Sequence, residues 1–195
     1  MFDKVKLKHW NETAESGNPA AVMDVLGELK GLAIGDIGSG GGYYALKFAG
    51  AVGAGGKVYA IDVEPSNLKY VAELVKENGY ANVETVMIEG ADIPLKEKSI
   101  DLFFSRNSYH HIGSPVEYFA NVRRFLKPGG RLVIIDHLST SKKAIVKDHG
   151  HFTPAETIRE NMEQAGFRHT ESFDMLEDES FNVFIKDEFG NRRKP

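Results

Sequence analysis

The stretch from Asp36 to Tyr43 constrains the fold of this chain most, because it places four glycines within five consecutive positions, 38–42. An apolar run, 32–34, precedes it, and a segment with a helical pattern, 44–49, follows it. This order predicts a glycine-rich turn from a buried strand into a helix N-terminus, where backbone N–H groups face a ligand at close range. A dinucleotide fingerprint needs a third glycine where this chain has Tyr43. The turn therefore favours a nucleoside ligand without a pyrophosphate.

Asp62 supports the same interpretation. It ends a second apolar run, 57–61, and lies 20 residues beyond Gly42. An acid at the tip of the second strand is placed to accept hydrogen bonds from ribose hydroxyls.

The composition indicates a globular domain of ordinary hydrophobicity, with 195 residues, 42% of them hydrophobic, and a net charge of -4. The charge gives no general attraction for nucleic acid or for an anionic membrane. No apolar run reaches the roughly 20 residues of a membrane span, and the charged N-terminus lacks the apolar core of a signal peptide. We therefore expect a cytoplasmic protein. The absence of cysteine excludes disulfides, thiolate metal sites and a cysteine nucleophile in this chain.

Apolar runs alternate with helical patterns along most of the chain. Asn18 and Pro19 indicate the start of a first helix, which Gly31 is expected to end. The alternation then predicts strands at 32–37, 57–62, 83–88, 100–105 and 131–136. A hairpin of 167–174 and 181–185 follows, on either side of the acidic stretch 177–179. The predicted fold class is a doubly wound, Rossmann-like α/β fold with a seven-stranded sheet, mostly parallel with a C-terminal antiparallel hairpin.

Four further motifs support the interpretation of the glycine-rich turn and Asp62. They are Lys-Pro-Gly-Gly-Arg-Leu at 127–132, Tyr-His-His-Ile at 109–112, His-Phe-Thr-Pro at 151–154 and Ala-Gly-Phe at 165–167. With them, residues 18–186 resemble the class I S-adenosylmethionine-dependent methyltransferases. The resemblance is closest to the small branch that includes the ubiquinone and menaquinone C-methyltransferases. It implies a single domain over residues 1–195, with an N-terminal cap segment at 1–30, a core at 31–186 and a tail at 187–195.

The resemblance also implies a binding site for S-adenosylmethionine. The turn would hold the methionine and ribose parts, Asp62 the ribose hydroxyls, and Glu89, with Asp92 as the alternative, the adenine amino group. The residues expected to contact the cofactor are Asp36, Gly38, Ser39, Gly40, Gly42, Tyr43, Asp62, Glu89, Gly90, Asp92, Ser105 and Asn107.

Several histidines lie where loops leave the carboxyl ends of strands, which is where ligands bind in an open α/β sheet. His110 and His111 follow the fourth strand, and His137 follows the fifth. A histidine at such a place is able to take a proton from an acceptor, and these three are the candidate catalytic residues. For any one histidine taken alone, a helix cap or a solvated surface position is the more common role, and this alternative stays open.

A metal site is a weaker alternative. Asp136, His137, His149 and His151 offer carboxylate and imidazole ligands that suit zinc or iron. Their spacing matches no specific signature, so the sequence predicts no resident metal ion.

The expected function is methyl transfer to a small-molecule acceptor. The lack of cysteine argues against cytosine-C5 methylation and thiol-dependent arsenic methylation. Two alternatives stay open: a non-catalytic cofactor-binding or activating subunit of a methylation complex, and a metal-assisted enzyme that uses the histidines. No insertion that would cap an acceptor pocket is visible, so a second copy of the chain or a partner subunit is a further expectation.

Overall fold

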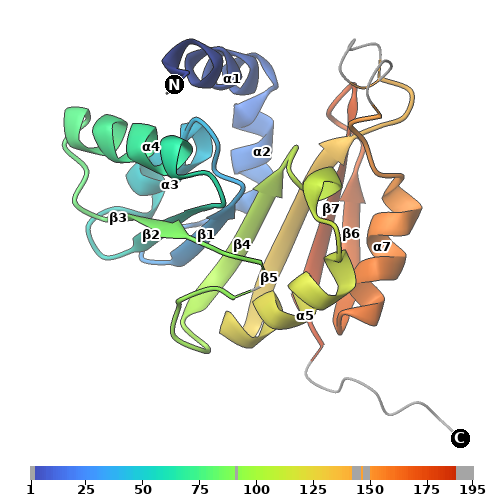
Figure 1. Cartoon of the computed structure of the whole chain (residues 1–195). Helices are drawn as coiled ribbons and strands as arrows, with labels where there is room; N and C mark the ends of the chain where they lie inside the picture. The colour runs from blue at the N-terminus through green and yellow to red at the C-terminus, as the bar shows by residue number, and fades with distance from the viewer. Residues whose placement is uncertain (1–2, 91, 142–145, 147–149, 188–195) are drawn as a thin grey trace, which may run out of the picture. The chain divides into compact units, whose positions relative to one another are not determined.

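The computed structural model describes residues 3–90, 92–141, 146 and 150–187. It forms two compact units, residues 1–89 and 90–195, and each unit is described by itself (Figure 1). The division of residues 1–195 into a cap segment, a core and a tail of a single domain stays a prediction, and most of that tail lies outside the described residues.

The first unit is a three-stranded parallel sheet with helices. Its strands follow the spatial order β3-β2-β1, and Asp36 pairs with Ala60 where β1 runs beside β2. Helices α3 and α4 pack against these strands. The elements are α1 (Lys4–Ser16), α2 (Pro19–Leu26), β1 (Ala33–Ile37), α3 (Tyr43–Val52), β2 (Lys57–Asp62), α4 (Pro65–Glu77) and β3 (Val83–Met87).

Helix α2 begins as the sequence predicts but ends earlier. The Asn18 side chain accepts a hydrogen bond from the backbone N–H of Ala21, and Pro19 occupies the first turn. The expected end at Gly31 is wrong, because Gly27 already leaves the helical conformation with φ of 75°. A positive φ at a helix end favours glycine.

The second unit contains two parallel strands extended by an antiparallel pair, in the order β4-β5-β7-β6. Helices α5 and α7 lie side by side on one face of these strands in Figure 1 and contact each other. The elements are β4 (Ile100–Arg106), the 3-10 helix η1 (Tyr109–His111), α5 (Pro115–Phe125), β5 (Leu126–His137), α7 (Ala155–Gln164), β6 (Phe167–Phe173) and β7 (Glu179–Lys186).

Strand β5 is longer than the expected 131–136, since it includes the Lys-Pro-Gly-Gly segment. The register shifts at this segment: Ile100 pairs with Leu126, whereas Leu102 pairs with Arg131. Residues 127–130 therefore lie opposite the single residue Asp101, and Gly129 has φ of 73°. The predicted turn at 127–130 is wrong, because the segment is an irregular, bulged part of β5.

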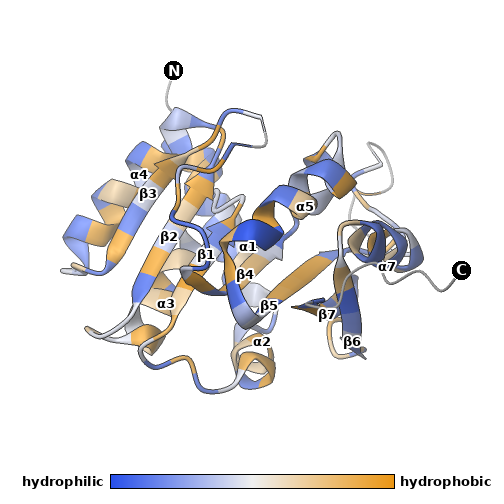
Figure 2. Ribbon diagram, turned by 90° about the horizontal axis from the view of Figure 1, so that it is seen from below, coloured by the Kyte–Doolittle hydropathy of each residue, from blue (hydrophilic) through white to orange (hydrophobic). Residues whose placement is uncertain are grey.

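The core of each unit follows from its apolar strands. Ile34, Val58 and Ile61 are fully or almost fully buried in the first unit, and Phe103 and Ile134 in the second. Figure 2 shows hydrophobic residues along β5 and hydrophilic residues along β6, which borders only β7. The predicted α/β class, mostly parallel and ending in an antiparallel pair, is confirmed. Among the described residues, no helix has the length and apolarity to cross a membrane.

Candidate functional site

The glycine-rich turn joins β1 to α3 in the first unit. Gly38, Gly40 and Gly42 have φ of 71°, 50° and 81°, a region that other residues rarely adopt. A side chain at Gly42 would also lie 2.8 Å from Val71. Backbone conformation therefore favours glycine at all three positions, and limited space does so at Gly42 as well. The turn leads directly into the N-terminus of α3.

Asp62 fixes this turn from the end of β2. One carboxylate oxygen accepts a hydrogen bond of 2.9 Å from the Gly40 N–H, and the other accepts one of 2.9 Å from the Glu64 N–H. The Asn67 side-chain amide lies 3.2 Å from both oxygens. Asp62 is buried, so these bonds hold its carboxylate in one place at the mouth of the turn. The carboxylate has four lone pairs for three donor groups, because the Asn67 amide is shared between the two oxygens, so it retains capacity for one hydroxyl donor.

Asp36 is a second buried acid of this site. Burial raises its pKa to about 7, the negative charge of Asp62 adds to the increase, and a hydrogen bond from the Ala45 backbone N–H opposes it. Its Oδ2 atom and the Oγ atom of Ser39 are buried and have no hydrogen-bond partner among the described residues. Unsatisfied buried polar atoms beside an open main-chain turn fit a polar ligand that donates hydrogen bonds.

Helix α1 covers the same turn, which the sequence did not reveal. Asn11 donates a hydrogen bond of 2.7 Å to the carbonyl of Gly41. The Trp10 ring lies 3.3 Å from the position that a Cβ on Gly40 would take. Tyr43, a predicted cofactor residue, donates its hydroxyl hydrogen to Glu15 of α1. The one feature of the sequence analysis that pointed to this contact was the expectation that residues 1–30 form a cap segment.

The remaining predicted cofactor residues lie after β3, near the end of β4 and just after β4. Glu89 in the first unit, and Gly90 and Asp92 in the second, are exposed, and an adenine contact through either acid stays a prediction. Ser105 is fully buried, with its hydroxyl 2.7 Å from that of Ser108.

Asn107 belongs to a buried polar network. Its backbone has φ of 54°, and its amide donates a hydrogen bond of 2.5 Å to Glu179. Glu179 also forms an ion pair of 2.6 Å with Arg106, and both side chains are almost completely buried. The positive φ of Asn107 lies in the left-handed region, which costs energy for a residue other than glycine. The surrounding structure must therefore hold the Asn107 backbone in this conformation. The sequence placed Glu179 in the acidic stretch between two strands of a hairpin and gave no sign of this network.

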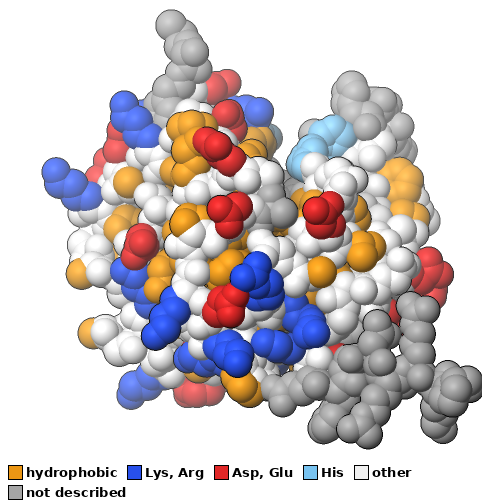
Figure 3. Space-filling model, turned by 60° about the horizontal axis from the view of Figure 1, so that its bottom comes forward, with side chains coloured by type: hydrophobic (Ala, Val, Ile, Leu, Met, Phe, Trp, Pro, Cys, Tyr) orange, Lys and Arg blue, Asp and Glu red, His pale blue; other side chains and the backbone are white. Residues whose placement is uncertain are grey.

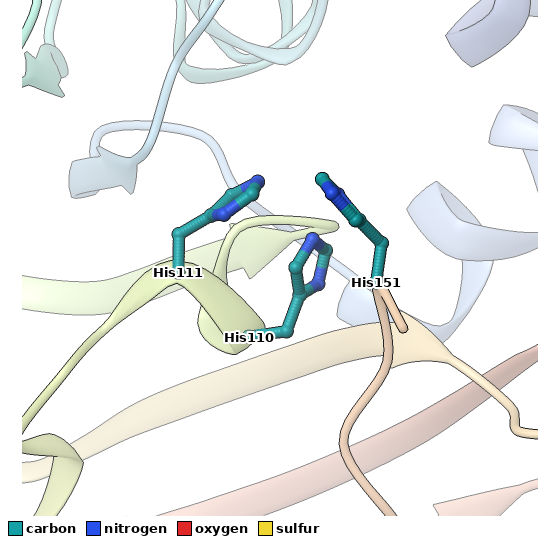
Figure 4. Close-up of side chains that lie close together, drawn as sticks. All are labelled: His110, His111 and His151. Carbon is teal, nitrogen blue, oxygen red and sulfur yellow. The ribbon is translucent and has the colours of Figure 1, made fainter. Parts of the chain in front are cut away.

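Four histidines of the second unit, His110, His111, His137 and His151, gather near the carboxyl ends of β4 and β5. His110 Nδ1 lies 2.7 Å from Asp136 Oδ1, and both side chains are buried. The ring of His137 is 6.1 Å from that of His110, and its Nδ1 is 3.8 Å from Glu179. His151 points toward His110 and His111, with ring separations of 5.1 and 5.0 Å (Figure 4).

The structure thus brings together His110, His111 and His151, whereas the sequence grouped His151 with His149, His137 and Asp136. Of that predicted group, Asp136 holds His110, and His149 lies outside the described residues. Proton transfer by His110, His111 or His137 stays a prediction.

Comparison with known proteins identifies the family of this chain. A SAM-dependent methyltransferase from Aquifex aeolicus is 28% identical, with a TM-score of 0.84, and the match covers 95% of this chain and 98% of that one. A tRNA U34 carboxymethyltransferase from Desulfotalea psychrophila is 32% identical over 56% of this chain and 33% of the relative. A ubiquinone/menaquinone biosynthesis C-methyltransferase from Pseudomonas putida is 27% identical over 67% of this chain and 52% of the relative.

The matches span about half or less of these two curated relatives' own length. The model of the methyltransferase domain family, in contrast, matches residues 28–183, most of this chain. The chain therefore belongs to the methyltransferase domain family, within the class I methyltransferases that use S-adenosylmethionine.

Proposed function

We propose that this chain transfers the methyl group of S-adenosylmethionine to a small-molecule acceptor. The observation that carries the proposal is the turn of the first unit, where the Gly40 N–H is held by Asp62 beside the unsatisfied Asp36 and Ser39 oxygens. This combination offers acceptors for ribose hydroxyls and for an amino group.

Within this proposal, Asp62 holds the ribose, and Asp36 and Ser39 receive the amino group of the methionine part. S-adenosylmethionine supplies a methyl group on an electrophilic sulfonium. The chain then needs to bind the cofactor, align the acceptor and, where the acceptor requires it, remove a proton. His110, His111 and His137 are our candidates for proton removal, because they lie where β4 and β5 end.

The acceptor class is inferred from charge and from the diversity of relatives. The two curated relatives named above have names that refer to different acceptors, a tRNA and a quinone precursor, so family membership alone leaves the acceptor undetermined. The net charge of -4 gives the chain no general electrostatic attraction for nucleic acid. A cytoplasmic location stays a prediction.

Calorimetry with S-adenosylhomocysteine tests the binding site. We expect Asp62→Ala to weaken binding about 10–100-fold, because hydrogen bonds to a charged group contribute about 1.5–3 kcal/mol. Asp24→Ala, at an exposed position of α2, is the control and is expected to bind as the parent does. Thermal unfolding of each variant checks that the fold is retained. Unchanged affinity in Asp62→Ala, or preferential binding of a pyridine nucleotide, would refute the assignment.

Turnover requires a separate measurement. We expect release of S-adenosylhomocysteine when the protein is supplied with S-adenosylmethionine and a panel of quinols, phenols and carboxylic acids. Cofactor binding without turnover on any of them, together with a stable partner in size-exclusion chromatography, would favour the alternative of a non-catalytic or activating subunit.

A further inference from the structure

We propose that His110, His111 and His151 bind a single divalent transition-metal ion, with zinc as the ion that best fits three imidazole ligands. Each side chain offers one ligand nitrogen, and the three nitrogens lie within 4.8 Å of one another. Figure 4 shows the three rings pointing toward one another. This inference is independent of the proposed methyl transfer, since it depends only on the geometry of these side chains.

Two segments that are far apart in the sequence build the cluster. His110 and His111 belong to η1, which follows β4, and their rings are 4.2 Å apart. His151 precedes α7, in a short turn where the Phe152 N–H donates to the Gly150 carbonyl. The approach of these two segments brings the three rings together.

Asp136 provides the outer-shell partner that metal-binding histidines usually have. Its Oδ1 atom lies 2.7 Å from His110 Nδ1, and the Asp136 side chain is completely inaccessible to solvent. Because the carboxylate accepts, Nδ1 carries the hydrogen, which leaves the Nε2 lone pair for a ligand. Carboxylate–histidine–zinc arrangements of this kind fix the tautomer, orient the ring and raise its basicity.

The spacing is compatible with an ion after a small adjustment. Tetrahedral bonds of about 2.1 Å place ligand nitrogens about 3.4 Å apart. Closing from 4.8 Å requires a shift of about 1 Å or slightly more, which side-chain rotation of the exposed His111 can supply. Three protein ligands leave a position for water or for an oxygen of another molecule.

Solvent can reach the cluster, and among the described residues no second cluster competes with it. His111 is exposed, and Figure 3 shows histidine side chains at the surface. Within residues 3–90, 92–141, 146 and 150–187, this is the one group of three or more potential ligand side chains close enough to hold an ion. The cysteine-free chain offers no thiolate, so nitrogen and oxygen donors determine the choice of metal.

Metal-depleted protein titrated with zinc tests the inference. We expect one zinc ion per chain by elemental analysis and, with cobalt(II), visible absorption bands typical of a site with nitrogen ligands. His111→Ala and His151→Ala should each weaken zinc binding by more than the about 10–100-fold expected for Asp136→Asn, which changes only the outer shell.

His9→Ala is the control, since His9 is exposed on α1 and outside the cluster. It should retain the affinity and the cobalt spectrum of the parent. Less than stoichiometric zinc in the parent would overturn the inference. Equal zinc affinity in the parent and in His111→Ala would also overturn it, and because His111 is exposed this variant is expected to fold.

Discussion

Replacement of Asp36 by asparagine tests whether this buried acid is protonated near neutral pH. Its pKa is about 7 in the folded protein, against an ordinary 3.8. Between these values the folded state keeps a proton that the unfolded chain has lost, so the stabilisation is complete below pH 3.8 and declines as the pH rises toward 7. At about 1.4 kcal/mol per pH unit, the loss reaches about 4 kcal/mol, of which about 2.5 kcal/mol falls between pH 5 and pH 8.

Urea unfolding of the cofactor-free protein at pH 5, 6, 7 and 8 measures this loss. Asparagine cannot titrate, so Asp36→Asn should gain stability relative to the parent by up to about 2.5 kcal/mol across this range. Groups common to both proteins cancel in the difference. Asp24→Asn makes the same chemical change at an exposed position and is the control. A difference between parent and Asp36→Asn that stays constant with pH would show that Asp36 is already ionised in the folded protein, and the reasoning would fail.

Three further predictions follow from neighbouring contacts. Cofactor binding should tighten as the pH rises toward 7, because Asp36 must lose its proton to pair with an amino group, and Asp36→Asn should abolish this dependence in calorimetry. Gly41→Ala should displace α1, because the added Cβ would lie 2.6 Å from a backbone carbonyl of that helix, and the fluorescence of the single tryptophan should shift to the red. Gly55→Ala, which has open space around it, is the control and should leave the fluorescence unchanged. Glu179→Ala should cost about 3–5 kcal/mol in chemical denaturation, because it removes the buried partner of Arg106; replacing both residues by apolar ones should cost less.

The elements that the sequence predicted well depend on local patterns. The turn after β1 needs only a short run of glycines between an apolar strand and a helix, and Asp62 is identified by its place at the end of the next apolar run. Parallel pairing of β1 and β2 then brings both strand ends to the same edge. The end of α2 was missed because Gly27 and Gly31 are both plausible stops, and backbone conformation alone distinguishes them.

The features that could not be predicted depend on contacts between distant residues. Asn11 reaches Gly41 across 30 positions, and no periodicity in the N-terminal segment specifies that contact. Glu179 lies 73 positions beyond Arg106, and an acid in a hairpin is normally solvated unless a partner is buried beside it. Likewise, three histidines meet because η1 and the segment before α7 approach each other, which residue spacing cannot show.

The tautomer of His110 makes metal binding and proton removal by this side chain mutually exclusive. Nδ1 is engaged by Asp136, so a single lone pair, on Nε2, is left. That lone pair can coordinate a metal ion or accept a proton from an acceptor molecule, but it cannot do both at once. Stoichiometric zinc should therefore suppress methyl transfer if His110 is the proton acceptor. If zinc instead leaves turnover unchanged or increases it, proton removal must belong to another group, of which His137, outside the three-histidine cluster, is the nearest described imidazole candidate.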